Sequence, residues 1–200
     1  MREIPAPMQT LKQRILAEGR NLGGGILKID SILNHQLDPG LMQEMGRELA
    51  RRFAGTPIDR ILTAEISGIA PALMTGLALG VPVVYARKRK PITMSGQVFV
   101  ETAPSHTKGG EVSLMVSAEF MPAGANVLIV DDFLATGETL FALARLVKSA
   151  GANLAGAGVV VEKTFEGGRE RLRQAGCAGM RIEALAVISN MDQGKIVFAD

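Results

Sequence analysis

The sequence predicts a single α/β domain with a central, mainly parallel sheet flanked by helices. The chain has 200 residues, of which 47% are hydrophobic and 21% are charged, and this apolar content is enough for one substantial core. From about residue 60 onward, short uninterrupted apolar runs alternate with helical patterns. Strands of that kind are buried on both faces, which is typical of a parallel sheet covered by helices. We therefore expect residues 1–200 to form one domain.

The N-terminal part of the chain predicts two helices with a short strand between them. Apolar residues at helical spacing predict a helix that begins near Met8 and ends at Gly19. Residues 26–29 then form a strand-like run after three glycines. Asp38 and Pro39 predict the start of the second helix, because Asp caps free amides and Pro is tolerated in the first turn. We expect this helix to run to about residue 53.

The remainder of the chain supplies the alternating elements of the sheet. The predicted strands are residues 60–64, 81–85, 127–130, 154–161 and 181–184, and the predicted helices are residues 69–79, 138–150 and 169–175. Residues 88–118 interrupt this pattern with Pro, Gly, Ser and Thr, and they contain two strand-like runs at 97–101 and 111–116. A long insertion of this composition predicts a mobile lid rather than part of the core.

The composition argues against several classes of protein. A net charge of +2 is too small for bulk binding of nucleic acid. Residues 66–86 carry no charge and are long enough to span a membrane, but Gly80 and Pro82 divide them into a helical half and a strand half. A single cysteine, Cys177, and two histidines leave no Cys/His metal cluster. We expect a cytoplasmic protein that binds neither nucleic acid nor membrane and holds no metal of its own.

The segment 127–139 carries the most specific chemistry. Its apolar strand leads into Asp131 and Asp132 and then into a turn that opens a helix. Because the carboxyl ends of parallel strands face the ligand crevice, both carboxylates are delivered there. The residues around this turn that offer free amides and hydroxyls to an anion are Ala135, Thr136, Gly137, Glu138 and Thr139. Taken singly, these features equally describe the end of a strand and the start of a helix, but the whole string suits a ribose phosphate.

Two further segments are candidates for holding an anion. Ser67 and Gly68 follow the strand at 60–64 and precede a helix, and Gly allows either a close approach to a ligand or a positive φ. Arg87 and Lys88 begin a short basic run at the end of the next strand, where cations suit a pyrophosphate group. The alternatives are a helix cap for the first segment and a solvated basic loop for the second.

The whole string at 127–139 resembles the phosphoribosyl pyrophosphate signature of the type I phosphoribosyltransferases, and residues 64–71 resemble the pyrophosphate loop of that family. Residues 105–108 resemble part of the lid loop of the xanthine enzymes, which implicates Lys108 in catalysis. The resemblance implies the type I fold, with a small hood formed by residues 1–40 and 162–200 and a flexible lid at 88–118. It also implies a homodimer and Mg²⁺ that is carried mainly by the substrate.

The purine base is expected beneath the hood. Residues 26–39 resemble the hood segment of the xanthine enzymes, which implicates Leu27 and Asn34 in holding the base, whereas Asn34 alone would be a turn residue. Lys163 ends a buried strand, and its ammonium group donates hydrogen bonds but accepts none, which favours an oxo group over an amine. A surface lysine is the alternative. Phe133 packs either on the face of the base or in the core.

The resemblance implies an enzyme that transfers a phosphoribosyl group from phosphoribosyl pyrophosphate to xanthine and forms xanthosine 5′-monophosphate. Two alternatives stay open: the same reaction on guanine or hypoxanthine, and a transcription regulator that uses this fold to sense phosphoribosyl pyrophosphate. Such regulators carry an added DNA-binding domain, and about ten residues ahead of the first predicted helix are too few for one. We therefore favour the enzyme over the regulator.

Overall fold

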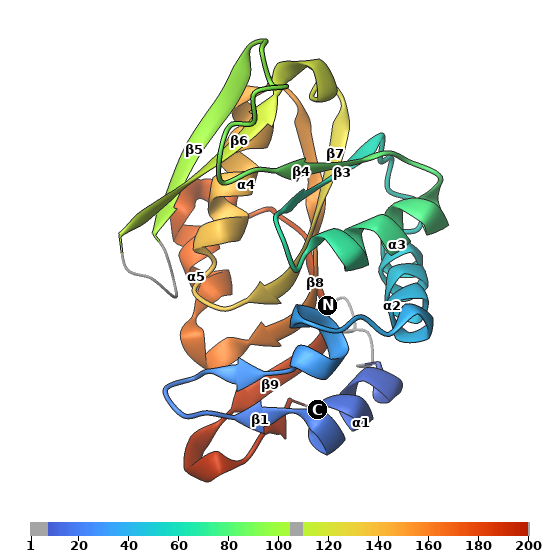
Figure 1. The fold of residues 1–200 in the computed structure, drawn as a ribbon, viewed down its shortest axis with the longest axis vertical. Coiled ribbons are helices and arrows are strands. Elements are labelled where there is room, and N and C mark those ends of the chain that lie inside the picture. The colour runs from blue at the N-terminus through green and yellow to red at the C-terminus, as the bar shows by residue number, and fades with distance from the viewer. Residues whose placement is uncertain (1–7, 105–109, 200) are drawn as a thin grey trace.

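The computed structural model describes residues 8–104 and 110–199, and its centre is a six-stranded sheet (Figure 1). Five neighbouring strands run parallel, and β10 pairs antiparallel with β9 at one edge. In spatial order the strands are β10 (Val197–Phe198), β9 (Ile182–Asn190), β8 (Asn153–Lys163), β7 (Asn126–Leu134), β3 (Arg60–Ala64) and β4 (Val83–Ala86). The mainly parallel sheet predicted from the apolar runs is confirmed.

Helices cover both faces of this sheet. One face packs against α1 (Gln9–Glu18), α2 (Pro39–Arg52) and α3 (Ile69–Leu79), and the other against α4 (Glu138–Ser149) and α5 (Gly168–Leu172). Ile61 and Leu128 join the first core, whereas the residues that follow them, Leu62 and Ile129, join the second. Because successive strand residues point to opposite faces, the apolar runs fill two cores at once. Within the described residues, no helix is long and apolar enough to cross a membrane.

The predicted start of α2 is confirmed. Asp38 accepts hydrogen bonds from the backbone amides of Gly40 and Leu41 at 3.0 and 3.2 Å, and Pro39 occupies the first turn. The other carboxylate oxygen of Asp38 accepts a 2.8 Å hydrogen bond from Arg14 in α1. One carboxylate therefore caps α2 and ties α1 to it.

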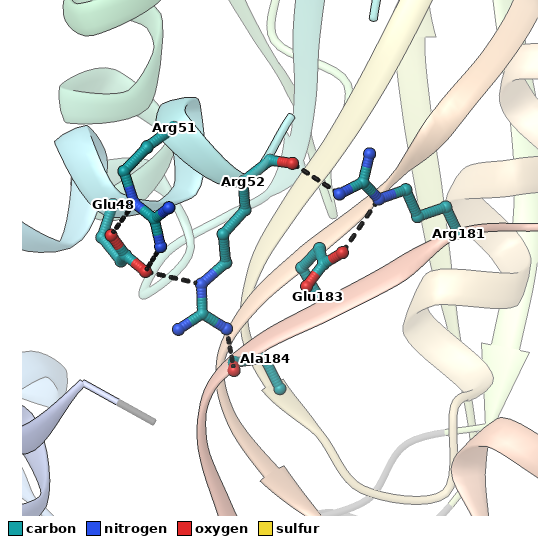
Figure 2. A network of polar contacts seen from close by, with 6 residues as sticks. All are labelled: Glu48, Arg51, Arg52, Arg181, Glu183 and Ala184. Carbon is teal, nitrogen blue, oxygen red and sulfur yellow. Dashed lines mark hydrogen bonds and ion pairs between the residues drawn. The ribbon is translucent and has the colours of Figure 1, made fainter. Parts of the chain in front are cut away.

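The other end of α2 is fixed to the sheet by a network of charged side chains (Figure 2). Arg52, which is 5% exposed, donates to the carbonyl oxygen of Ala184 in β9 at 2.7 Å and to Glu48 at 2.8 Å. Arg181 donates to the carbonyl oxygen of Arg52 and to Glu183. A buried guanidinium needs such partners, because an unpaired charge away from water is costly. The network therefore holds α2 against β9.

Segments from the two ends of the chain lie side by side at one end of the molecule, where Figure 1 shows blue elements beside red ones. Here β1 (Arg20–Asn21) and β2 (Leu27–Lys28) form a short hairpin, which a π-helix at Asp30–Asn34 follows. The side chain of Asn21 donates to the carbonyl oxygen of Met191, just beyond β9. These contacts bring together the two parts of the expected hood, and their role in covering a ligand stays a prediction.

The segment expected to form a lid contains an antiparallel hairpin of β5 (Val98–Pro104) and β6 (Glu111–Ser117). Leu114 of β6 is buried in the core that includes α4, and Glu101 of β5 forms a 2.8 Å ion pair with Arg145 of α4. Alternate side chains of β6 enter this core, as the period of a strand requires. The hairpin is thus anchored to α4. The mobility of the lid at 88–118 stays a prediction, and residues 105–109 of this segment lie outside the described residues.

Several strands extend beyond their predicted ends. The sequence predicts that β7 ends at residue 130, yet its pairing with β8 continues through Asp131 and Phe133, which lie opposite Val159 and Val161. Backbone groups make this pairing, so a polar side chain does not end it. Strands β8 and β9 are also longer than predicted, and the two-residue strands β1 and β10 carry too little pattern to predict. Four short helical turns complete the chain, at Ala118–Phe120, Thr164–Glu166, Arg173–Cys177 and Asp192–Gly194.

Candidate active site

A cavity of about 690 Å³ lies at the carboxyl ends of β3, β7 and β8. This is the edge at which open parallel sheets bind ligands. The predicted site residues that line it are Leu27, Ser67, Lys88, Asp131, Asp132, Phe133, Ala135, Thr136, Gly137, Glu138, Thr139 and Lys163. The structure therefore brings the acidic pair, the turn after it, the first loop, the basic run and the hood segment to one place.

Asp131 and Asp132 form an acidic pair at the end of β7, in which Asp131 is buried and Asp132 is half-buried. Asp131 is 4% exposed, and its carboxylate accepts a 3.1 Å hydrogen bond from the amide of Asp132, whose own carboxylate accepts one from the amide of Phe133 at 3.0 Å. Burial raises the pKa of Asp131 well above its usual value, and the neighbouring charge of Asp132 raises it further. Burial also raises the pKa of Asp132. A bound cation, or hydroxyl groups that donate hydrogen bonds, would stabilise the charged form of these two carboxylates.

The turn between β7 and α4 presents backbone amides to the cavity. Gly137 has a φ of 86°, a left-handed conformation that glycine adopts at little cost, and α4 begins at the next residue. Since this N-cap residue has no side chain, the first amides of α4 receive no cap from it. Glu138 lines the cavity, but its carboxylate pairs with Arg171 of α5. The turn thus has the features of an anion site at a helix start.

The first loop and the basic run are joined by Glu65. Its Oε1 accepts a 2.7 Å hydrogen bond from the backbone amide of Lys88, and its Oε2 lies 3.9 Å from Nε of Arg87. A cis peptide bond joins Glu65 to Ile66. Both segments therefore keep a fixed relation to each other beside the acidic pair, and Ser67 and Lys88 line the cavity from this side.

Gly68 and Arg87 are predicted site residues that do not line the cavity. Gly68 has a φ of −69°, which excludes the positive φ that was one of the two alternatives for this glycine. A Cβ at this position would lie 2.3 Å from Oγ1 of Thr63 and 2.5 Å from Oδ1 of Asp131, so glycine is needed for close packing within the protein. Arg87 forms an isolated backbone bridge to β6. Lys108 lies outside the described residues.

Lys163 ends β8 at the hood side of the cavity. Its ammonium group donates to the carbonyl oxygen of Gly25 at 2.9 Å and forms an ion pair with Glu166. The nitrogen lies 5.8 Å from the centre of the Phe133 ring. An ammonium group has three N–H donors, so these two partners leave one for a ligand. Its side chain is 11% exposed, which argues against the alternative of a surface lysine, and both Phe133 and Leu27 line the cavity beside it.

Asn34 lies at the end of the π-helix rather than in the cavity lining. Its side-chain nitrogen donates to Oγ of Ser67 at 3.1 Å and to Oδ2 of Asp132 at 3.2 Å. The residue is therefore within contact of two predicted site residues, which the alternative of an isolated turn residue does not explain.

Nine other residues line the cavity, and none of them is among the predicted site residues: Ile26, Ala64, Glu65, Ile66, Ala103, Pro104, Val112, Leu114 and Leu140. The signal for Glu65 was its place beside Ser67 in the loop that resembles a pyrophosphate loop. For the β6 residues, the alternation of apolar side chains at 111–116 was the signal, because one face of such a strand has to be covered.

The fold and the cavity define a phosphoribosyltransferase. Residues 45–184 match the family model for the phosphoribosyl transferase domain, and the chain belongs to this family. The predicted family and fold class are confirmed. Among curated relatives, the xanthine phosphoribosyltransferase of Heliobacterium modesticaldum is 53% identical over 96% of this chain and all of its own length. That of Deinococcus deserti is 49% identical over 94% of this chain and 95% of its own.

Solved structures that match this fold include adenine phosphoribosyltransferases. The enzyme from Thermoanaerobacter pseudethanolicus superposes with a TM-score of 0.72 at 27% identity and covers 88% of this chain and 98% of its own. The enzyme from Saccharomyces cerevisiae, solved with an imino-altritol bisphosphate and adenine, has a TM-score of 0.71 at 29% identity, with 88% and 99% covered. The likeness to the xanthine enzymes in sequence is therefore greater than the likeness to these adenine enzymes.

Proposed function

We propose that this chain transfers the 5-phosphoribosyl group of phosphoribosyl pyrophosphate to xanthine and forms xanthosine 5′-monophosphate and pyrophosphate. The observation that carries the proposal is the single cavity in which Asp131 and Asp132, the turn at 135–139 and Lys163 meet. The near full-length similarity to relatives named xanthine phosphoribosyltransferase supports the choice of base.

The phosphoribosyl group fits the part of the cavity near α4. The amides at 135–139 receive the 5′-phosphate, and the carboxylates of Asp131 and Asp132 accept hydrogen bonds from the ribose hydroxyls. Ser67 and Gly68, with Arg87 and Lys88, serve the pyrophosphate group. The family resemblance adds Lys108 from the lid segment.

The base fits the hood side of the cavity. Lys163 donates a hydrogen bond from its remaining N–H to an oxo group of the base. An exocyclic amine cannot accept this hydrogen bond, so adenine is disfavoured. The ring of Phe133 and the side chain of Leu27 bound an apolar slot for the planar purine. Asn34 supplies a further polar contact once it leaves its present partners.

The reaction is the attack of a purine ring nitrogen on the anomeric carbon, with inversion and departure of pyrophosphate. We assign no residue as a strong general base. The residues act by positioning the two substrates and by stabilising charge in the transition state, and the acidic pair lies where positive charge develops on the ribose.

The acidic pair also fits Mg²⁺, because this ion prefers carboxylate oxygens and keeps other positions for substrate oxygens and water. Both carboxylates line the cavity in which the substrate is proposed to bind, and a cation there would favour their ionised forms. We infer that the pyrophosphate and ribose oxygens of the substrate carry most of the ion's coordination, with Asp131 and Asp132 beside it. When bound, the ion neutralises charge on the pyrophosphate leaving group.

We further infer a homodimer and a cytoplasmic location. Leu73 and Leu77 of α3 are 53% and 68% exposed, they lie one turn apart on one face of the helix, and Ile66 in the preceding loop is 79% exposed. An apolar face of this kind suits contact with a second copy. Leu73→Asp should then shift the molar mass, measured by light scattering, from that of two chains to that of one. The one cysteine, Cys177, suits a reducing compartment.

Steady-state assays with phosphoribosyl pyrophosphate, Mg²⁺ and each of xanthine, guanine, hypoxanthine and adenine test the proposal. The expected result is the highest kcat/KM for xanthine and the lowest for adenine. A higher kcat/KM for guanine or hypoxanthine than for xanthine would show that this other base is the preferred substrate. If no nucleotide forms from any base and the protein binds DNA in a salt-sensitive way, the proposed enzymatic activity is refuted and a transcription regulator is favoured.

A further inference from the structure

Arg171 lies in α5, yet it reaches the turn that we propose binds the 5′-phosphate. Its Nε forms an ion pair with Oε1 of Glu138. The side chain of Glu138 is 14% exposed and lines the cavity, whereas that of Arg171 is 56% exposed and approaches from the solvent side. Within residues 135–139, Glu138 is the one ionisable residue. The net charge of the turn therefore depends on Arg171.

The backbone of α5 packs directly against this turn. A Cβ at Gly168 would lie 2.3 Å from the carbonyl oxygen of Ala135 and 3.1 Å from the amide nitrogen of Gly137. Leu172, at the other end of α5, is buried in the core below. This close packing fixes α5 beside the turn, so Arg171 extends from a rigid position.

A second ion pair fixes α5 to the sheet. Arg169 donates to both carboxylate oxygens of Glu162 at 2.6 Å, and Glu162 is 2% exposed. Glu162 precedes Lys163 in β8, so this pair anchors α5 near the base side of the cavity. The two arginines of α5 thus serve different ends of the site: Arg169 fixes the helix, and Arg171 pairs with the turn.

The charge of Glu138 matters because the 5′-phosphate is a dianion. An unpaired carboxylate beside it would repel the phosphate. An acidic side chain at a helix start also accepts hydrogen bonds from the first amides, which are the groups that the phosphate needs. The ion pair with Arg171 both compensates the negative charge and holds the carboxylate on the α5 side.

We propose that Arg171 is a positioning residue for the 5′-phosphate: through Glu138 it keeps the turn at 135–139 free of uncompensated negative charge. The inference rests on the proposed function, because it takes this turn as the phosphate subsite. Arg171 itself touches no substrate atom in this role.

The test is Arg171→Met, which keeps most of the side-chain length and removes the charge. Calorimetry with ribose 5-phosphate and, separately, with inorganic pyrophosphate measures the two subsites independently. We expect the Kd for ribose 5-phosphate to rise about 10-fold and that for pyrophosphate to change less than about 2-fold. In turnover, the KM for phosphoribosyl pyrophosphate should rise about 10-fold while kcat stays within about 2-fold, as for a loss of binding common to ground and transition states.

Three variants separate this role from a general effect on folding. Arg171→Lys should bind ribose 5-phosphate nearly as wild type. Glu138→Gln combined with Arg171→Met should recover most of the lost affinity, because the uncompensated charge is gone. Arg173→Met removes a matched arginine of the same surface, whose partner is Glu170, and should leave both ligands unaffected.

An unchanged Kd of Arg171→Met for ribose 5-phosphate, an equal loss for both ligands, or no recovery in the double variant would overturn the inference. These measurements need no transfer reaction. If the wild type binds ribose 5-phosphate but forms no nucleotide from xanthine, the proposed function fails while the comparison between Arg171→Met and wild type still decides the role of Arg171.

Discussion

The side-chain nitrogen of Asn34 donates a hydrogen bond to Oδ2 of Asp132 at 3.2 Å, which joins the N-terminal hood segment to the acidic pair. The same nitrogen donates to Ser67 in the first loop at 3.1 Å. One amide group of the hood therefore contacts both the first loop and the end of β7. A ligand that engages either carboxylate or amide has to exchange these hydrogen bonds, so the hood and the ribose site respond to each other.

Asn34→Ala should lower kcat/KM about 10- to 100-fold, because a hydrogen bond to a charged group contributes about 1.5–3 kcal/mol. Asn34→Asp should be worse, since it adds a third carboxylate next to a pair that already repels. Steady-state kinetics with xanthine measures both. Asn153→Ala is the control, because that side chain binds the carbonyl oxygen of Gly124 at the opposite end of the sheet. Equal activities for Asn34→Ala and Asn34→Asp would contradict the charge argument.

Asp131→Asn with Asp132→Asn should lower kcat/KM by about 1,000-fold or more, because groups aimed at developing charge contribute about 100- to 1,000-fold each. The same variant should be more stable than wild type at neutral pH, since it removes adjacent like charges. A gain of about 1 kcal/mol corresponds to a rise of roughly 2–4 °C in Tm for a chain of this length.

The sign of the pH dependence follows from the raised pKa values. Well below the ordinary value of 3.8 the pair is neutral in both the folded and the unfolded chain, so Tm of wild type and variant should converge. As pH rises, the unfolded chain ionises first and the wild type loses stability relative to the variant. Thermal melts from pH 4 to pH 8 measure this difference. A Tm gap that shrinks with rising pH would show that the acidic pair is not the cause.

Local signals in the sequence were sufficient for most elements of the fold. The observed bounds of β3 and α3 are the predicted ones, because the intervening Ser67 and Gly68 separate an apolar strand from an apolar helix. Strand β7 runs past its predicted end, since its pairing partner β8 supplies backbone groups that no local pattern reports. The strands of the β5–β6 hairpin could be recognised as apolar runs at 97–101 and 111–116, but the Pro, Gly and Ser around them indicated a mobile lid and gave no sign of their packing against α4.

The candidate site likewise has a part that the sequence predicts and a part that depends on the fold. The signature 127–139 is continuous in sequence and could be found there as one string. The partners of its members could not: Asn34 meets Asp132, and Arg171 meets Glu138, only because the fold brings hood and α5 to the same edge of the sheet. Contacts of this kind depend on packing between distant segments, for which a single sequence carries no direct signal.

Lys163→Ala should remove the preference for oxopurines. Without the ammonium donor, the ratio of kcat/KM for xanthine to that for adenine should fall about 100-fold or more, because a missing hydrogen-bond partner strongly changes discrimination. Glu166→Gln is the matched control: it removes an ion-pair partner of Lys163 but keeps the ammonium group, so the preference should persist. An unchanged ratio in Lys163→Ala would remove this residue from the base site.

Gly68→Ala tests how tightly the first loop packs on the acidic pair. The added Cβ would lie 2.3 Å from Oγ1 of Thr63 and 2.5 Å from Oδ1 of Asp131, and both atoms belong to buried strand residues that have little room to move. We expect a loss of about 1–3 kcal/mol in stability from overpacking, together with a lower kcat as Asp131 is displaced. Gly96→Ala is the control, because nothing lies within 4 Å of its added Cβ. Thermal melts and steady-state kinetics on both variants measure the two effects. If Gly68→Ala keeps the wild-type kcat, the loop can shift without moving Asp131, and the carboxylate does not depend on this contact for its position.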